Sequence, residues 1–201
     1  CSSTLTSSAA QMCARFDEHR KQVYPATVRF GDIAPGMKGY ARITHAIAER
    51  QDLPSIFQVV VRSLEEHLPV DFAGMLDYQH HSRHLAVSRV GPRSEALAGS
   101  LGMRESATLD ADDDGWARCL AGQLVYEPDI TDIVFPFPRR LATAGLRSLV
   151  IVPLMVEQRS GVFGVLVVAR RTAGAFSSGD CEFLRQLCDH VSLAANQAQL
   201  H

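Results

Sequence analysis

Three imidazole side chains lie within one short segment of the chain, at His80, His81 and His84. Neutral imidazole is a common zinc ligand, and a closed zinc site needs about four nitrogen or sulfur ligands around the metal. The segment is the polar tip between two apolar runs, and on a strand pair the adjacent His80 and His81 point to opposite faces. A fourth ligand would have to come from elsewhere, so we expect a solvated turn here and no metal site.

A run of carboxylates, residues 112–114, immediately precedes Gly115 and Trp116. Clustered aspartates can bind calcium, but this run lacks the alternating ligands and the terminal Glu of an EF-hand loop. Aspartates are also favoured where a helix begins, because they accept hydrogen bonds from its unpaired N–H groups. We therefore expect these residues to cap a short helix at 115–120.

The thiols do not form a pattern that indicates catalysis. An odd number of cysteines at scattered spacings predicts neither a disulfide framework nor a zinc site, and it fits a reducing cytosol. Only Arg118 neighbours the central thiol as a cation that could lower its pKa, so we expect that thiol to be inert. The five cysteines are Cys1, Cys13, Cys119, Cys181 and Cys188.

Two further segments could contact a planar or anionic ligand. Trp116, the only tryptophan, could stack on a planar group, although a lone aromatic residue on a short helix also fills a core. In Phe-Pro-Phe-Pro-Arg-Arg, residues 135–140, the guanidinium groups of Arg139 and Arg140 could hold a carboxylate or a phosphate. In the alternative, the rings fill the core and the arginines are solvated.

The composition describes one domain with a sizeable core plus an extension. Of the 201 residues, 46% are hydrophobic and 21% are charged, and the net charge is −2. This charge creates no field that would attract nucleic acid or an anionic membrane. No apolar stretch approaches the ~20 residues of a membrane span, and no signal peptide opens the chain. Because the chain starts at Cys1 and not at methionine, we expect a fragment of a longer protein.

The first part of the chain predicts helices. Residues 9–24 can form a weakly amphipathic helix that ends at Pro25, and residues 25–39 have the composition of a linker. Apolar residues at helical spacing then predict a short helix at 40–50 and a longer one at 53–68.

Two hairpins must provide the sheet. The first joins residues 70–78 to 85–90, and the second joins residues 148–156 to 162–169. The second pair is apolar on both faces, which predicts central strands covered on each side. Pro153 would remove a ladder donor, so we expect a bulge or a local bend there, with Gly164 facing it across the hairpin.

These segments together resemble the GAF domain family. In that family a glycine and a short Arg-Ser-apolar-apolar-Pro-Leu strand lead through a turn to a Gly-apolar-Leu-apolar-Val strand and a later phenylalanine. Residues 71–78 resemble the family's first strand, and 122–130 its short strand with a following aspartate, so the resemblance covers roughly residues 40–200. The matching motif positions are Gly145, Arg147, Ser148, Pro153, Leu154, Gly164, Val165, Leu166 and Phe176.

The resemblance implies a mixed α/β (α+β) fold. A central antiparallel sheet would carry the helices that start near 53 and 178 on one face and a loop-built pocket, residues 91–146, on the other, with long terminal helices. It divides the chain into a connector helix and linker, 1–39, and a GAF sensory domain with a C-terminal signalling helix, 40–201. By position, the resemblance implies a ligand pocket lined by Met75, Asp77, Trp116, Phe137, Arg139, Ser148 and Val150.

Particular branches of the family have signatures that this sequence lacks. Asp132-Ile133-Val134 lacks the proline of the bilin-binding Asp-Ile-Pro segment, and no cysteine lies in 131–156. The Asn-Lys…Phe…Asp-Glu signature of cyclic-nucleotide-binding members is not found. The free methionine sulfoxide reductases need several cysteines that converge on the pocket, where only Cys119 is expected. Haem-binding members use a pocket histidine, for which His84 is the candidate. No cofactor is therefore assigned.

The last helix carries a further pattern. Ser177 and Asp180 can form a cap, and apolar residues then recur every three or four positions, which predicts a coiled-coil seam that pairs with a second chain. The alternative is a single helix that packs on its own sheet. The end of the chain resembles the connector between GAF and kinase domains in bacterial sensor histidine kinases. The expected seam residues are Leu184, Leu187, Val191, Ala194 and Ala198.

The resemblance thus implies a non-enzymatic, cytoplasmic input module of a bacterial sensor histidine kinase. It would form a homodimer, bind a small ligand and act on an output domain in the same chain, with no membrane or nucleic-acid contact and no catalytic residue. Two alternatives remain open. The domain could be a ligand-free dimerisation spacer, with its pocket filled by its own side chains, or a small redox enzyme that depends on Cys119.

Overall fold

The computed structural model describes residues 37–50, 52–111, 115–156 and 161–198. The expected connector helix at 9–24 and the aspartates at 112–114 lie outside these residues. The helix expected from residue 40 begins earlier, as α2 (Met37–Ala48), so the end of the expected linker is helical. Ile43 and Ile47 are buried in the core, and this packing outweighs the cost of Gly39 in the first turn.

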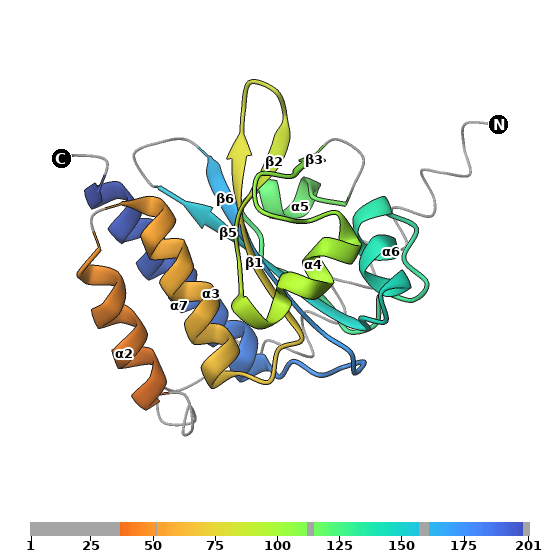
Figure 1. The fold of residues 1–201 in the computed structure, drawn as a ribbon, viewed down its shortest axis with the longest axis horizontal. Helices are drawn as coiled ribbons and strands as arrows, with labels where there is room; N and C mark the ends of the chain where they lie inside the picture. Colours follow the sequence, from red (N-terminus) through yellow and green to blue (C-terminus); the bar gives the residue numbers. More distant parts are fainter. Residues whose placement is uncertain (1–36, 51, 112–114, 157–160, 199–201) are drawn as a thin grey trace.

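The centre of the domain is a six-stranded antiparallel sheet with the order β3-β2-β1-β6-β5-β4 (Figure 1). The two long hairpins expected from the sequence are both present. They supply the four central strands, and short strands close each edge. The strands are β1 (Phe72–Gln79), β2 (His84–Val90), β3 (Thr108–Asp110), β4 (Val125–Glu127), β5 (Ser148–Met155) and β6 (Val162–Arg170).

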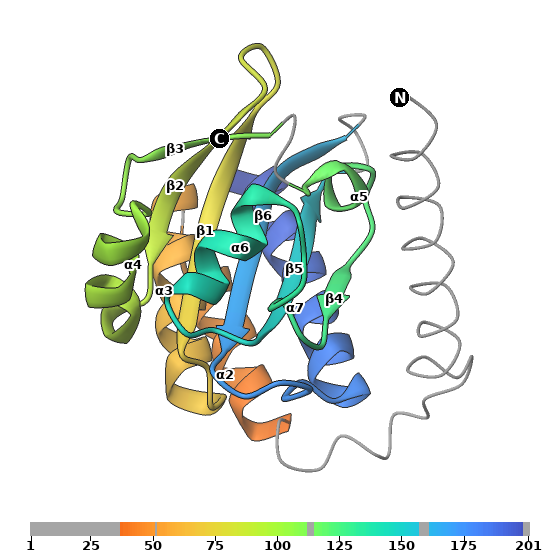
Figure 2. The same ribbon diagram turned by 90° about the vertical axis from the view of Figure 1, so that its right-hand side faces the viewer.

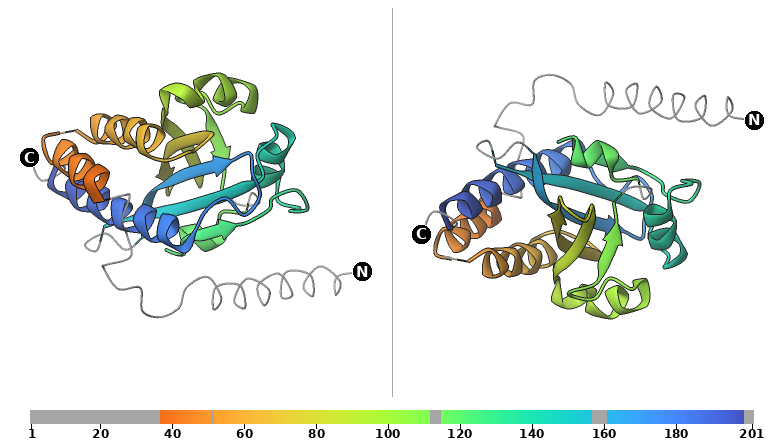
Figure 3. Two further views of the ribbon diagram at one scale, coloured as in Figure 1. Left: turned by 90° about the horizontal axis from the view of Figure 1, so that it is seen from below. Right: turned by 90° about the horizontal axis from the view of Figure 1, so that it is seen from above.

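Helices cover both faces of the sheet (Figures 1 and 3). One face carries a layer of α2, α3 (Leu53–His67) and α7 (Ser178–Ala198), which contact one another. The opposite face carries shorter helices joined by loops, as Figure 2 shows: α4 (Glu95–Leu101), α5 (Ala117–Leu120) and α6 (Pro136–Thr143). The 3₁₀ turn η1 (Pro92–Ser94) leads into α4 and contacts α3. The expected α+β arrangement is confirmed.

Because side chains alternate along a strand, the sheet separates two apolar cores. Val150, Val152 and Leu154 of β5 face the first helical layer, in what we call the α3–α7 core. Leu149 and Ile151 of the same strand face the other side, in what we call the α5–α6 core. Both cores consist of fully buried side chains, as two-sided apolar strands require.

The hairpin of β5 and β6 has the irregularity expected near Pro153. The register shifts between Leu154 and Met155. Gly164 pairs with Leu154, however, and Val165 pairs with Pro153, so the expected pairing is wrong by one residue. A Cβ at Gly164 would lie 2.7 Å from the carbonyl oxygen of Leu76, so this glycine permits the close approach of β1.

The start of α7 has the expected reciprocal cap. The Ser177 N–H donates to Asp180 Oδ2 (2.9 Å), and the Asp180 N–H donates to Ser177 Oγ (3.1 Å). In the described part of the chain, no helix has the length and apolar character needed to cross a membrane.

Candidate functional site

The expected pocket residues divide between the two faces of the sheet. Met75 and Val150 lie in the α3–α7 core, whereas Trp116 and Phe137 lie in the α5–α6 core. Asp77 follows Met75 by two residues and Ser148 precedes Val150 by two, so each shares the face of its neighbour. A single pocket cannot contain all of them, because they lie on opposite faces of the sheet. The resemblance gave positions along each strand but did not show which face each residue occupies.

Two of these residues have internal partners. The Ser148 hydroxyl donates to the carbonyl of Thr172 (2.8 Å), and the residue is buried. Asp77 is half-buried, and this burial raises the pKa of its carboxyl, while a hydrogen bond with Ser88 and the charge of Arg89 act in the opposite direction. The partners of Ser148 and Asp77 are thus residues of the strands or of the loops that join them.

Trp116 and Phe137 come together on the opposite face. Their ring centroids are 4.2 Å apart at an interplanar angle of 34°, and both side chains are fully buried. Met103 and Leu141 are buried in the same cluster. The space in which we expected a ligand pocket is thus occupied here by the domain's own side chains.

One polar atom in this packed region has no partner. The indole Nε1 of Trp116 is buried and makes no hydrogen bond within the part of the chain described. A buried donor without an acceptor costs about 1–3 kcal/mol. An acceptor from a small molecule would relieve this cost, so the indole N–H is a candidate recognition group.

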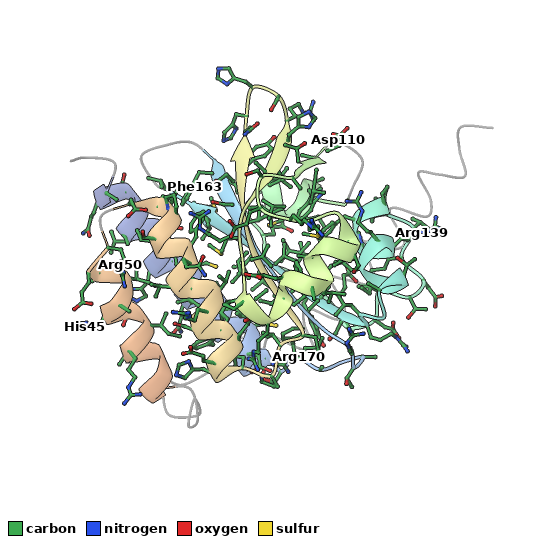
Figure 4. All side chains as sticks on the ribbon, viewed as in Figure 1. His45, Arg50, Asp110, Arg139, Phe163 and Arg170 are labelled. Carbon is green, nitrogen blue, oxygen red and sulfur yellow. The ribbon has the colours of Figure 1, made fainter. Side chains whose placement is uncertain are left out.

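The rings are covered by two short segments, residues 115–120 and 135–143, which we call the α5–α6 cover. Phe135, half-exposed at the start of α6, packs over Gly115: a Cβ at this glycine would lie 3.0 Å from Phe135 Cγ. Gly115 has a φ of +86°, so a larger residue would be strained there. Arg139 lies on the outer side of α6, exposed and directed away from the sheet (Figure 4).

The described thiols are all inside the domain. Cys119, Cys181 and Cys188 are reduced and buried. Burial raises the pKa of Cys119, and also that of Cys188, well above the ordinary value. A thiolate nucleophile is unfavourable in such surroundings.

The tip of the first hairpin carries the three histidines that we considered as metal ligands. His80 contacts the Tyr78 ring edge-on, with centroids 4.6 Å apart. Within the described ranges, no group of three or more His, Cys, Asp or Glu side chains is close enough to hold a metal ion. The Nδ1 atom of His84 is buried and has no hydrogen-bond partner in those ranges.

The apolar stripe of α7 packs on the domain itself. Leu184, Leu187 and Val191 are fully buried in the α3–α7 core, and Ala194 and Ala198 pack against the same cluster. The expected seam toward a second chain is therefore wrong for the buried leucines and valine, because they contact the protein's own sheet. The exposed face of α7 instead carries Leu193, which is 57% exposed.

Sequence reasoning missed Glu127, a carboxyl in the edge strand β4. It is half-buried, and desolvation raises its pKa to about 7, while the charge of Arg118 opposes that increase. The signal in the sequence was an acid placed directly after Val125 and Tyr126 in an apolar strand.

The motif residues of the second hairpin mostly hold the fold together. Arg147 forms an ion pair with Asp129 (2.5 Å), whose loop follows β4. Phe176 meets the Tyr126 ring edge-on and stacks under the guanidinium group of Arg170. These contacts fix the ends of strands, which explains how a sequence motif can specify a fold without specifying a ligand.

Comparison with known proteins identifies the fold. A family model described as the GAF domain matches residues 52–195. No curated protein sequence matches the chain. At the low sequence identities that follow, likeness to solved structures establishes the fold alone.

Three solved structures illustrate the range of proteins that share it. Free methionine-R-sulfoxide reductase from Neisseria meningitidis, in complex with its substrate, has a TM-score of 0.68 at 16% identity, over 89% of this chain and 98% of that chain. The GAF domain of a phosphoenolpyruvate-protein phosphotransferase from Coxiella burnetii gives 0.67 at 15%, over 85% and 98%. The GAF domain of a two-component sensor histidine kinase from Bacillus halodurans gives 0.61 at 23%, over 75% and 98%.

Proposed function

The chain belongs to the GAF domain family, and from that premise we propose that it is the regulatory input module of a bacterial sensor histidine kinase. A kinase GAF domain of the same fold supports this assignment. In this proposal the module is cytoplasmic and non-enzymatic, forms a homodimer, and acts on an output domain in the same protein.

The ligand we propose is a small molecule with a hydrogen-bond acceptor that binds beside Trp116. The observation that carries this proposal is the buried indole N–H, which has no acceptor in the described structure. Entry would require the α5–α6 cover to move, and Phe135 is its exposed contact with Gly115. A ligand that fits only the opened cover shifts the domain toward that state by its difference in affinity for the two states.

Strand β5 offers a physical route from this site to the terminal helix. It contacts α5 on one face and α7 on the other. The Met155 N–H at its end donates to the Ser192 hydroxyl of α7 (3.0 Å). Movement of the cover would therefore act on α7 through one rigid element.

Because Trp116 is the only tryptophan, its fluorescence reports on the proposed site directly. We expect at least one member of a panel of small acceptors, such as nicotinamide and adenine, to shift the emission. The Trp116→Phe variant keeps a ring but lacks the N–H, so calorimetry should show about tenfold weaker binding of the same compound. If no compound changes the emission, ligand binding beside Trp116 is rejected.

The ligand-free spacer is the second candidate, and the stacking of Trp116 on Phe137 favours it. A spacer should show no emission change with any compound and should still dimerise. The redox enzyme has less support, because the described thiols are buried and burial raises the pKa values of Cys119 and Cys188.

A further inference from the structure

A groove lies at the end of the sheet where β1 starts and β6 ends, next to α4, and Trp116 is not among its lining residues. Figure 4 labels Arg170, the last residue of β6, close to this end of the sheet. Its volume is about 520 Å³, within the range of about 300–1,000 Å³ that is usual for small-molecule sites. Its lining includes Val70, Asp71, Arg93, Leu97, Ser100 and Arg171.

Two guanidinium groups line this groove, and within the described residues both retain donors without a partner. Arg93 has a side chain that is 65% exposed, and its charge contact is Nε to Glu65 Oε2 at 3.9 Å, beyond hydrogen-bond distance. Arg171 Nη1 donates to the carbonyl oxygen of Ala144 (3.2 Å). An arginine has five N–H donors, so most of them are available to a ligand in both residues.

The groove also contains a carboxylate in a fixed position. Asp71 Oδ2 accepts the backbone N–H of Arg171 (2.8 Å), which leaves its second oxygen free for a cation. The Ser100 hydroxyl donates to the carbonyl of Leu97 (2.8 Å) and can still accept a hydrogen bond. The charged groups of the lining are thus two cations and one anion, beside an apolar surface formed by Val70 and Leu97.

The backbone that carries Arg93 is rigidly supported from behind. The buried carboxylate of Glu65 accepts the Arg93 N–H (2.8 Å) and the Ser94 hydroxyl (2.6 Å). Ser94 Oγ in turn accepts the N–H of Ala73 in β1 (2.9 Å). A Cβ at Gly91 would lie 2.1 Å from Glu65 Oε1, so that glycine makes room for the carboxylate. Such support holds a binding residue in place before a ligand arrives.

We propose that this groove binds a small aliphatic α-amino acid. Its carboxylate would bind the guanidinium groups of Arg93 and Arg171, and its ammonium group would bind Asp71. Its side chain would lie on Val70 and Leu97. A simple carboxylate would place a second anion beside the Asp71 oxygen that accepts no N–H in the described residues, and a simple amine would face two cations. A zwitterion presents a group of each sign to this lining.

The test uses backbone-amide NMR shifts of the full chain with L-valine, L-leucine, isovalerate and isobutylamine. We expect the amino acids to shift the amides around Ser100 and Arg171 and to leave the Trp116 indole unchanged. Isovalerate lacks the ammonium group and isobutylamine lacks the carboxylate, so each should bind at least about tenfold more weakly. Equal binding of isovalerate, or no shift with either amino acid at millimolar concentration, overturns the proposal.

Substitutions of residues that line the groove test whether the amino acid binds there. Arg93→Gln and Asp71→Asn should each weaken L-valine binding about tenfold, because each removes one charged partner. Arg139→Gln is the matched control, since it removes the same charge from the exposed side of α6 and should change nothing (Figure 4). Asp71→Asn keeps an acceptor for the Arg171 N–H, so it remains informative if Arg93→Gln lowers stability. Unchanged affinity in a folded variant overturns the assignment.

Discussion

Glu127 is the side chain whose ionisation should most affect stability. Desolvation raises the pKa of its carboxyl to about 7, above the ordinary value of 4.5. The protonated form is therefore the one that the folded state favours. This contribution to stability is fully present below about pH 4.5 and is lost as the pH rises through about 7.

The difference in unfolding free energy between the Glu127→Gln variant and the wild type should grow as the pH rises. Near pH 4 the two should have similar free energies of unfolding, whereas near pH 9 the variant should be more stable by roughly 1–3 kcal/mol. Urea unfolding at several pH values measures this difference. Glu182→Gln is the control with the opposite sign, because a hydrogen bond from Arg185 lowers the pKa of Glu182. A constant gap between Glu127→Gln and wild type at all pH values would contradict the prediction.

The described thiols should not react while the protein is folded. In a Cys1→Ser/Cys13→Ser variant, the remaining cysteines are Cys119, Cys181 and Cys188, all buried. We expect no reaction with a chromogenic disulfide reagent until denaturant is added, because the reagent needs an accessible thiolate. Fast reaction of one thiol in the native protein would revive the redox-enzyme alternative.

At the residue scale, side-chain type was a better guide than side-chain direction. The sequence indicated that Trp116 and Phe137 are either ligand contacts or core residues, and their packing together is observed. It could not place Met75 and Val150 on the correct face, because a shift of one residue in a strand exchanges the faces. Whether the Trp116 N–H finds an acceptor, which it does not among the described residues, depends on how distant segments pack together. Spacing along the chain does not encode that packing.

Helix ends and hairpins that depend on residues close together in the sequence were predicted well. The α7 cap depends on residues three apart, and the hairpins depend on apolar runs around polar turns. The surface against which the apolar stripe of α7 packs could not be predicted from nearby residues. One apolar stripe on a helix can pack on its own sheet or on a second chain, and only the tertiary structure distinguishes these.

Truncation of Leu187 and truncation of Leu193, both in α7, should therefore have very different effects on stability. Leu187 is fully buried, so Leu187→Ala should cost about 2–5 kcal/mol of unfolding free energy. Leu193 is 57% exposed, and Leu193→Ala should change it by less than about 0.5 kcal/mol. Urea denaturation of both variants measures this. Similar losses in the two variants would mean that the described packing of α7 is incorrect.

For the whole molecule, we propose different tasks for the two surfaces that the sheet separates. The short helices on one face cover the proposed ligand site, and the layer of α2, α3 and α7 on the other face is the surface proposed for pairing (Figure 3). Because Leu187 and Val191 are buried within the domain, we propose that pairing uses the outer face of this layer. Leu193 is one of the few large apolar side chains exposed among the described residues.

If the chain forms a homodimer through the outer face of α7, we expect Leu193 to lie in the contact. Leu193→Asp should convert a dimer into a monomer without lowering the thermal midpoint, since a desolvated charge opposes pairing while the core is untouched. Light scattering with size-exclusion chromatography measures the mass. Gln197→Glu introduces a charge of the same sign one turn later on the exposed side of α7 and should weaken pairing less. Persistence of the dimer in Leu193→Asp would show that pairing does not depend on this face of α7, and transmission through it would have to be abandoned.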